Sequence, residues 1–215
     1  MSVPDEHASR EPTFEQYLRG AAERGMVVNL MFEQRLFELV SVLHRITGLL
    51  TAENVAHELV GGLAVLVHVE EIDPEQSMLT RDVDLMIRRS DLRHVIDIAE
   101  RHGFRYRHAA SLDMLLYGDS DRARNAVRIL FSGEKVRQTQ VLPNPEIAPE
   151  RKNLQGRSVS VIPIPDLIRM KLSSYRLKDQ VHIQVMDAAG LIPLDIESGL
   201  PKELFARLTA VRASE

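Results

Sequence analysis

The chain is interpreted most readily from one stretch, Thr80–Ile87, which reads TRDVDLMI. Successive side chains of a β-strand point to opposite faces, so Asp82, Asp84 and Met86 share one face and three apolar residues anchor the other. The two carboxylates then lie about 7 Å apart and point the same way. Such a pair repels itself and is stabilised by a cation between its oxygens. The alternative is a solvated polar face of an edge strand, since acidic side chains are mostly exposed.

Length and composition indicate a soluble globular protein. The chain has 215 residues, 44% of them apolar and 27% charged, which suits one domain of generous size or a core with a helical appendage. It contains no cysteine, which excludes disulfides, thiolate zinc sites and cysteine nucleophiles. No apolar run approaches the roughly 18 residues of a membrane helix, and the polar N-terminus does not resemble a signal peptide, so a cytoplasmic protein is expected. The net charge of −4 argues against a dedicated duplex-DNA binder.

The order of the expected elements predicts an α/β (α+β) fold with a mixed central sheet flanked by helices. Residues 1–12 are expected to form a flexible arm, and residues 13–50 to form N-terminal helices, the first ended by Gly25. Residues 51–163 hold the core sheet and its helices, and residues 164–215 form a helical C-terminal part. Alternating apolar residues predict strands, and apolar residues at steps of three and four predict helices. The strands are 57–60, 82–87, 104–108, 113–117, 126–131 and 159–162, and the helices after the first two are 63–69, 90–102, 166–175, 178–189 and 201–212.

A glycine pair, Gly61-Gly62, separates the strand at 57–60 from the apolar helix that follows. A strand, a double glycine and a helix form a compact device for bringing backbone N–H groups up to a phosphate. A double glycine is also simply a tight turn, so this motif alone is a weak signal.

Three features occur in order along the chain: Gly61-Gly62, then TRDVDLMI, then the helical segment 167–183, which reads LIRMKLSSYRLKDQVHI. Together they resemble the polymerase-β-like nucleotidyltransferase superfamily. More narrowly, the chain looks like the small bacterial nucleotidyltransferases that include abortive-infection toxins of the type IV toxin–antitoxin class. The resemblance covers about residues 50–190 and implies the nucleotidyltransferase fold.

The resemblance implies roles for particular residues. Gly61, Gly62 and Thr80 would contact the phosphates of a nucleoside triphosphate, while Asp82 and Asp84 would bind magnesium and serve as the catalytic carboxylates. Phosphoryl transfer depends on positioning and on neutralising charge, which metal ions supply. The implied reaction moves a nucleoside monophosphate to a hydroxyl of a small molecule, RNA or protein.

Lys171 corresponds in the resemblance to a helical lysine near the triphosphate, followed by a cluster of Arg176, Lys178 and Asp179. The alternative for Lys171 is a solvated side chain or a helix-capping pair with Asp179. An antitoxin is the protein partner that the toxin–antitoxin resemblance implies.

Arg128 departs from the family pattern. A third carboxylate is expected in the strand at 126–131, on the face that meets Asp82 and Asp84, and Arg128 occupies that position. A guanidinium beside two carboxylates competes directly with a metal. Three interpretations stay open: one magnesium still binds, or Asp113 or Glu134 supplies the base, or catalysis is lost and the protein is a binding or regulatory module.

Basic residues elsewhere suggest a rim for an RNA or nucleotide tail. Arg122, Arg124, Lys135 and Arg137 belong to this set, together with the arginines of the segment 88–107. Ordinary solvated faces are the favoured interpretation, because few aromatic residues are interleaved for base stacking.

Overall fold

The computed structural model describes residues 14–73, 80, 82–118 and 126–214, and it divides the chain into two compact units, residues 1–37 and 38–215. One helix, α1 (Phe14–Ala52), contributes to both units. The expected helix end at Gly25 is wrong, since α1 continues through this residue. A glycine inside a helix costs only about 1 kcal/mol, which the neighbouring helix-forming residues offset. The expected arm, residues 1–12, lies outside the described residues.

The second unit is built on a seven-stranded mixed sheet in the order β3-β4-β5-β2-β1-β7-β6. The strands are β1 (His57–Val60), β2 (Val83–Ile87), β3 (Phe104–Ala109), β4 (Leu112–Tyr117), β5 (Ala126–Phe131), β6 (Glu150–Leu154) and β7 (Arg157–Val161). The α/β fold class predicted from the sequence is therefore confirmed.

The acidic strand β2 lies at the centre of this sheet. It pairs antiparallel with β1, where Val60 is opposite Asp84, and parallel with β5, where Arg128 is opposite Asp84. All five residues of β2 are buried. The edge-strand interpretation of the aspartates is therefore wrong, and the predicted position of Arg128 on the face of Asp84 is confirmed.

Two elements were missed by the sequence patterns. β6 occurs where the sequence patterns predict no strand, and it is an edge strand that pairs with β7. Its residues are mostly exposed and polar, so it lacks the apolar alternation by which strands are recognised. The helix α6 (Leu194–Ser198) has only five residues, fewer than a helical period can reveal.

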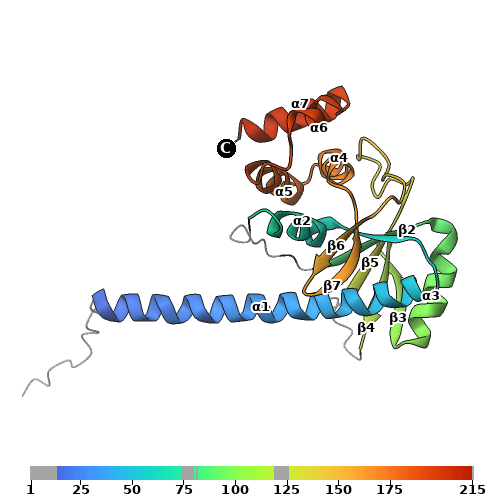
Figure 1. The fold of residues 1–215 in the computed structure, drawn as a ribbon, viewed down its shortest axis with the longest axis horizontal. Helices are drawn as coiled ribbons and strands as arrows, with labels where there is room; N and C mark the ends of the chain where they lie inside the picture. The colour runs from blue at the N-terminus through green and yellow to red at the C-terminus, as the bar shows by residue number, and fades with distance from the viewer. Residues whose placement is uncertain (1–13, 74–79, 81, 119–125, 215) are drawn as a thin grey trace, which may run out of the picture. The chain divides into compact units, whose positions relative to one another are not determined.

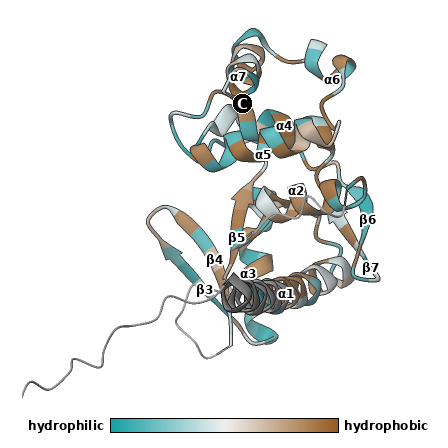
Figure 2. Ribbon diagram, turned by 90° about the vertical axis from the view of Figure 1, so that its left-hand side faces the viewer, coloured by the Kyte–Doolittle hydropathy of each residue, from teal (hydrophilic) through white to brown (hydrophobic). Residues whose placement is uncertain are grey.

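Helices cover both faces of the sheet (Figure 1). Those that follow α1 are α2 (Gly61–Glu70), α3 (Leu92–Arg101, preceded by the 3-10 turn Arg89–Asp91), α4 (Ile164–Ser174), α5 (Leu177–Ala188), α6 and α7 (Lys202–Arg212). Figures 1 and 2 show α2, α4 and α5 on one side of the sheet and α3 on the other. No helix in the described part of the chain is long and apolar enough to cross a membrane.

The core follows from the alternation in the central strands. Leu59, Leu85 and Ile129 occupy one face of the sheet and are 0–4% exposed. Figure 2 shows the central strands mostly in the apolar colour, whereas β3 and β6 at the two edges carry polar colours. The opposite face of the same strands carries Glu58, Asp84 and Arg128, so the functional candidates lie against a rigid apolar sheet.

We expect Leu85→Ala to lower the free energy of unfolding by about 2–5 kcal/mol, because it leaves a cavity in the middle of the sheet. The exposed Leu177, 81% accessible on α5, provides the control, and Leu177→Ala should change stability by less than about 0.5 kcal/mol. Urea unfolding followed by far-UV circular dichroism measures both, since the chain has no tryptophan. Equal effects of the two substitutions would contradict the assignment of the core.

Candidate functional site

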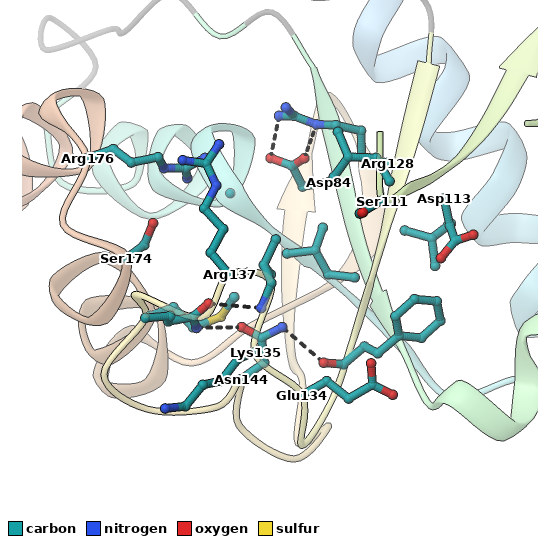
Figure 3. A pocket seen from close by; sticks show the side chains of 18 of the residues that line it. Asp84, Ser111, Asp113, Arg128, Glu134, Lys135, Arg137, Asn144, Ser174 and Arg176 are labelled. Carbon is teal, nitrogen blue, oxygen red and sulfur yellow. Dashed lines mark hydrogen bonds and ion pairs between the residues drawn. The ribbon is translucent and has the colours of Figure 1, made fainter. Parts of the chain in front are cut away.

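Arg128 holds both aspartates of the acidic stretch. Its Nε donates to Asp84 Oδ1 at 2.6 Å and its Nη2 donates to Asp84 Oδ2 at 3.1 Å, which makes a bidentate pair (Figure 3). The same Nη2 lies 2.9 Å from Asp82 Oδ2. The charges of Asp84 and Asp82 raise the pKa of the half-buried Arg128, although burial alone would lower it. The guanidinium is therefore a fixed counter-ion for the two carboxylates.

This geometry tests whether the site suits magnesium. A two-metal centre needs carboxylate oxygens that are free to bind cations, and here Asp82 and Asp84 are engaged by the positive charge of Arg128. Among the residues that the structure describes, no group of three or more histidine, aspartate or glutamate side chains is placed to hold a metal ion. The site fits a guanidinium and does not fit a two-metal centre. Magnesium binding by the aspartates stays a prediction, and it requires the arginine to move.

The glycine pair lies directly against this cluster. Gly61 has φ +77°, and a Cβ there would overlap the carboxylate of Asp84. A Cβ on Gly62 would come 2.8 Å from Thr80 Oγ1 and 3.4 Å from His182 Cε1. Only glycine permits this left-handed turn and close approach. The structure therefore brings together Gly61, Gly62, Thr80 and Asp84, as the resemblance implied.

The N-terminus of α2 begins at this turn. Val60, at the position before the helix, has no side-chain acceptor, and no side-chain hydrogen bond caps the helix. The first N–H groups of a helix lack intrahelical partners and favour an anion. The turn is therefore suited to a phosphate group.

Lys171 lies in the same pocket but its charge is committed to Asp179. Its Nζ is 3.5 Å from Asp179 Oδ1, and the two side chains are 5% and 0% exposed. Burial lowers the pKa of Lys171 to about 8, against the opposing effect of the Asp179 and Asp84 charges. Arg176 also binds Asp179, with its Nε 2.7 Å from Oδ2, and the Arg176 backbone N–H donates to the same Oδ2 at 3.3 Å, which caps the start of α5. Lys171 is therefore not solvated but forms a buried ion pair with Asp179, and its contact with a triphosphate stays a prediction.

Asp113 and Glu134, the two alternative bases, both border the pocket and both bind Arg89. Glu134 receives two hydrogen bonds from Arg89, at 2.9 and 2.6 Å, and Asp113 receives one at 3.5 Å. Asp113 also accepts from Tyr106 Oη at 2.5 Å and lies 2.7 Å from His108 Nδ1. Burial raises the pKa of Asp113, but the hydrogen bonds from Tyr106 and His108 outweigh it and lower the pKa overall. Neither carboxylate is free to replace the one that Arg128 displaces.

The pocket itself is a cavity of about 320 Å³. It is lined by the face of β2 and β5 that carries Asp84 and Arg128, by α4, and by the segment that follows β5. Several lining residues were not assigned a role from the sequence: His108, Ser111, Gln140 and Asn144. They come from separate segments, and no sequence spacing links them. Arg122 and Arg124 of the expected basic rim lie outside the described residues.

No protein-family model matches the chain, and no curated protein matches it. Among solved structures, an antigenic nucleotidyltransferase-like protein from Paracoccidioides brasiliensis is similar at a TM-score of 0.54 and 18% identity, over 83% of this chain and 88% of that one. ANT(2")-Ia in complex with adenylyl-2"-tobramycin is less similar, with a TM-score of 0.49 and 14% identity over 81% of this chain and 97% of that one. The lincomycin-bound lincosamide antibiotic adenylyltransferase LnuA is also less similar, with a TM-score of 0.47 and 18% identity over 69% of this chain and 96% of that one. These last two scores are too low to support a conclusion. The chain has the nucleotidyltransferase-like fold, and at these identities the likeness concerns the fold alone.

We expect Asp179→Ala to destabilise the protein by about 3–5 kcal/mol, because it leaves Lys171 buried without a counter-ion. The double variant Asp179→Ala, Lys171→Met should recover part of this loss, since it removes both buried charges. The exposed pair of Arg93 and Asp97, 3.2 Å apart on α3, is the matched control, and Asp97→Ala should cost less than about 1 kcal/mol. Urea unfolding measures all three variants, and no recovery in the double variant would contradict the interpretation.

The buried carboxyl group of Glu58 on β1 should make the stability of the protein depend on pH. It is fully buried, it accepts from the Ala148 N–H at 3.2 Å through Oε2, and its Oε1 has no hydrogen-bond partner among the described residues. Burial raises its pKa from 4.5 to about 7. The folded state therefore binds more protons than the unfolded state between these values, and the contribution of Glu58 to stability is lost as the pH rises from 4.5 to above 7.

Glu58→Gln should remove this contribution to the pH dependence. The variant should be more stable than the parent by roughly 2–4 kcal/mol at pH 8, and the difference should shrink toward acid pH. Urea unfolding at a series of pH values tests this, with the exposed Glu100→Gln as the control. Parallel pH profiles for the parent and Glu58→Gln would refute it.

Proposed function

We propose that this protein binds a nucleotide through the Gly61–Gly62 turn without a metal ion, as a binding or regulatory module with the nucleotidyltransferase-like fold. The observation that carries the proposal is the contact of Arg128 with both Asp82 and Asp84. Two uncompensated carboxylates beside the turn would repel phosphates, and a guanidinium neutralises them in place of a cation.

The pocket supports a nucleotide as the ligand. The start of α2 offers N–H groups to a phosphate, and Gly61 lets the Asp84 carboxylate lie against this turn because it has no Cβ. The cavity of about 320 Å³ is at the lower end of the range for small-molecule and cofactor sites. Lys171 lines its wall as a buried ion pair with Asp179.

Metal-dependent nucleotidyl transfer is the second candidate. The observation that favours it is the assembly of Gly61, Gly62 and Thr80 around Asp84, which is the arrangement that the sequence resemblance implies. It requires Arg128 to leave the two aspartates. The toxin–antitoxin assignment, with its antitoxin or RNA partner, stays a prediction from the sequence.

Isothermal titration calorimetry with ATP separates the two candidates. The parent protein should bind ATP with the same affinity in excess EDTA and in excess magnesium, because Arg128 already neutralises the aspartates. Arg128→Ala should bind ATP at least about tenfold more weakly in EDTA, and magnesium should restore much of the loss, since the freed carboxylates can then bind the ion.

The exposed Arg93→Ala on α3 is the charge-matched control and should behave like the parent. Circular dichroism confirms that each variant is folded. Magnesium-dependent ATP binding by the parent, with release of pyrophosphate, would contradict the proposal and favour metal-dependent nucleotidyl transfer. No ATP binding under either condition would also contradict it.

A further inference from the structure

The imidazole of His182 on α5 is buried without a hydrogen bond to satisfy it. The residue is only 9% exposed, and its Nδ1 is enclosed with no hydrogen-bond partner in the part of the chain that the structure describes. Most buried polar side-chain atoms in folded proteins have a partner, because burying one without a partner costs free energy. The packing of α5 therefore does not explain why a histidine occupies this position.

The polar end of this ring faces the start of α2. A Cβ on Gly62 would come 3.4 Å from Cε1, which is the atom of His182 nearest to that position. Cε1 is bonded to both ring nitrogens, so the end of the ring that carries them points at the turn. Thr80 Oγ1 lies beside the same glycine, 2.8 Å from the same Cβ position. Gly62 therefore lies against two side chains that can form hydrogen bonds.

His182 carries no charge near neutral pH. Burial lowers its pKa to about 3, and the charge of Lys171 adds to this effect. Lys178 and Arg176 act on the pKa in the same direction, while Asp179 opposes them. A neutral imidazole has one N–H and one bare nitrogen, and a buried N–H without an acceptor is rarer in proteins than a buried acceptor without a donor. The buried Nδ1 is therefore assigned as the bare nitrogen, and Nε2 carries the proton and can donate it in a hydrogen bond.

The N-terminus of α2 supplies further donors at the same point. This helix has ten residues and no side-chain hydrogen bond at its start, and the first N–H groups of a helix have no intrahelical acceptors. Phosphate oxygens are acceptors that can bind several donors at once. Donors from two elements far apart in the chain, α2 and α5, therefore converge where an anion is favoured.

We propose that His182 binds the phosphate group held at the Gly61–Gly62 turn, through a hydrogen bond that its Nε2 donates to a phosphate oxygen. The proposal rests on the proposed function and deepens it, because it names a side chain that recognises the anionic group of the ligand. The backbone at the turn and the ring on α5 would then contact the same phosphate from two sides. A phosphate, which only accepts hydrogen bonds when fully ionised, suits these donors, and an ammonium group does not.

Calorimetric titration of the full chain with ATP in excess EDTA tests the role of His182. His182→Leu should weaken ATP binding at least about tenfold, because it removes a hydrogen bond to a charged group. His182→Gln should bind ATP nearly as well as the parent, since the amide nitrogen of glutamine can take the place of Nε2. His182→Asn should bind as weakly as His182→Leu, because the shorter asparagine amide reaches only the position of Nδ1.

Urea unfolding separates this role from a structural one. His182→Leu should not lower the urea midpoint, because it replaces a buried polar group that has no partner with an apolar one. The matched control is His68→Leu in the last turn of α2, which removes another buried imidazole with an unpartnered Nδ1 among the described residues. His68 Nε2 lies 2.8 Å from the Ile162 carbonyl oxygen, so this control should lower the midpoint and leave the ATP affinity unchanged.

Nuclear magnetic resonance of the ¹⁵N-labelled histidine rings reads the donor directly, with His182→Leu identifying the signals of His182. The parent should show a protonated Nε2 and a bare Nδ1, and ATP should shift the Nε2 signal. A proton on Nδ1, or an Nε2 signal that ATP leaves unchanged, would overturn the proposal.

The ATP titrations distinguish failure of this proposal from failure of the proposed function. Equal ATP affinity in the parent and His182→Leu would overturn the role of His182 and leave the proposed function intact. The absence of ATP binding by the parent would overturn both. Equal weakening in His68→Leu, or equally weak binding by His182→Gln and His182→Leu, would also overturn the role of His182.

Discussion

The bridge from Arg128 to Asp84 and Asp82 is the interaction on which the rest of the site depends. β2 and β5 run parallel in the centre of the sheet, so their pairing sets the guanidinium opposite the carboxylate with little freedom to move. Without that positive charge, Asp84 would be a nearly buried anion pressed against Gly61. An uncompensated buried charge costs several kcal/mol, so the arginine and the aspartates have to be understood as one unit.

The same pairing of charges recurs around the pocket. Arg89 binds Glu134 and Asp113, and Asp179 is shared by Lys171 and Arg176. Each carboxylate that would serve as a metal ligand or a base is thus already engaged by a cation. Networks of this kind fix the positions of their members, and here they leave cations unpaired while no lining carboxylate is free. Six cationic side chains and four carboxylates line the pocket, and this excess of positive charge supports the proposed binding of an anionic ligand.

The fold by itself does not decide what this arrangement does. A nucleotidyltransferase-like sheet with a glycine turn can hold a phosphate whether or not a metal is bound beside it. The difference lies in one position, since a carboxylate at residue 128 would complete a metal site and an arginine there replaces the metal's charge. The proposed function follows from that residue and its contacts, and the likeness to other structures supports only the fold.

The sequence alone determined the central sheet, most of the helices and the face on which Asp84 and Arg128 meet, because alternation in a strand and helical periodicity are local properties. It also predicted the glycine turn. It left a pair of Lys171 with Asp179 as one of several alternatives, and it could not reveal that β2 is central or that Arg89 engages both Asp113 and Glu134. The contacts of Arg89 join residues far apart in the chain, since Arg89 and Glu134 are separated by 45 positions. Only tertiary packing brings such groups within hydrogen-bonding distance and removes the water that would otherwise screen them.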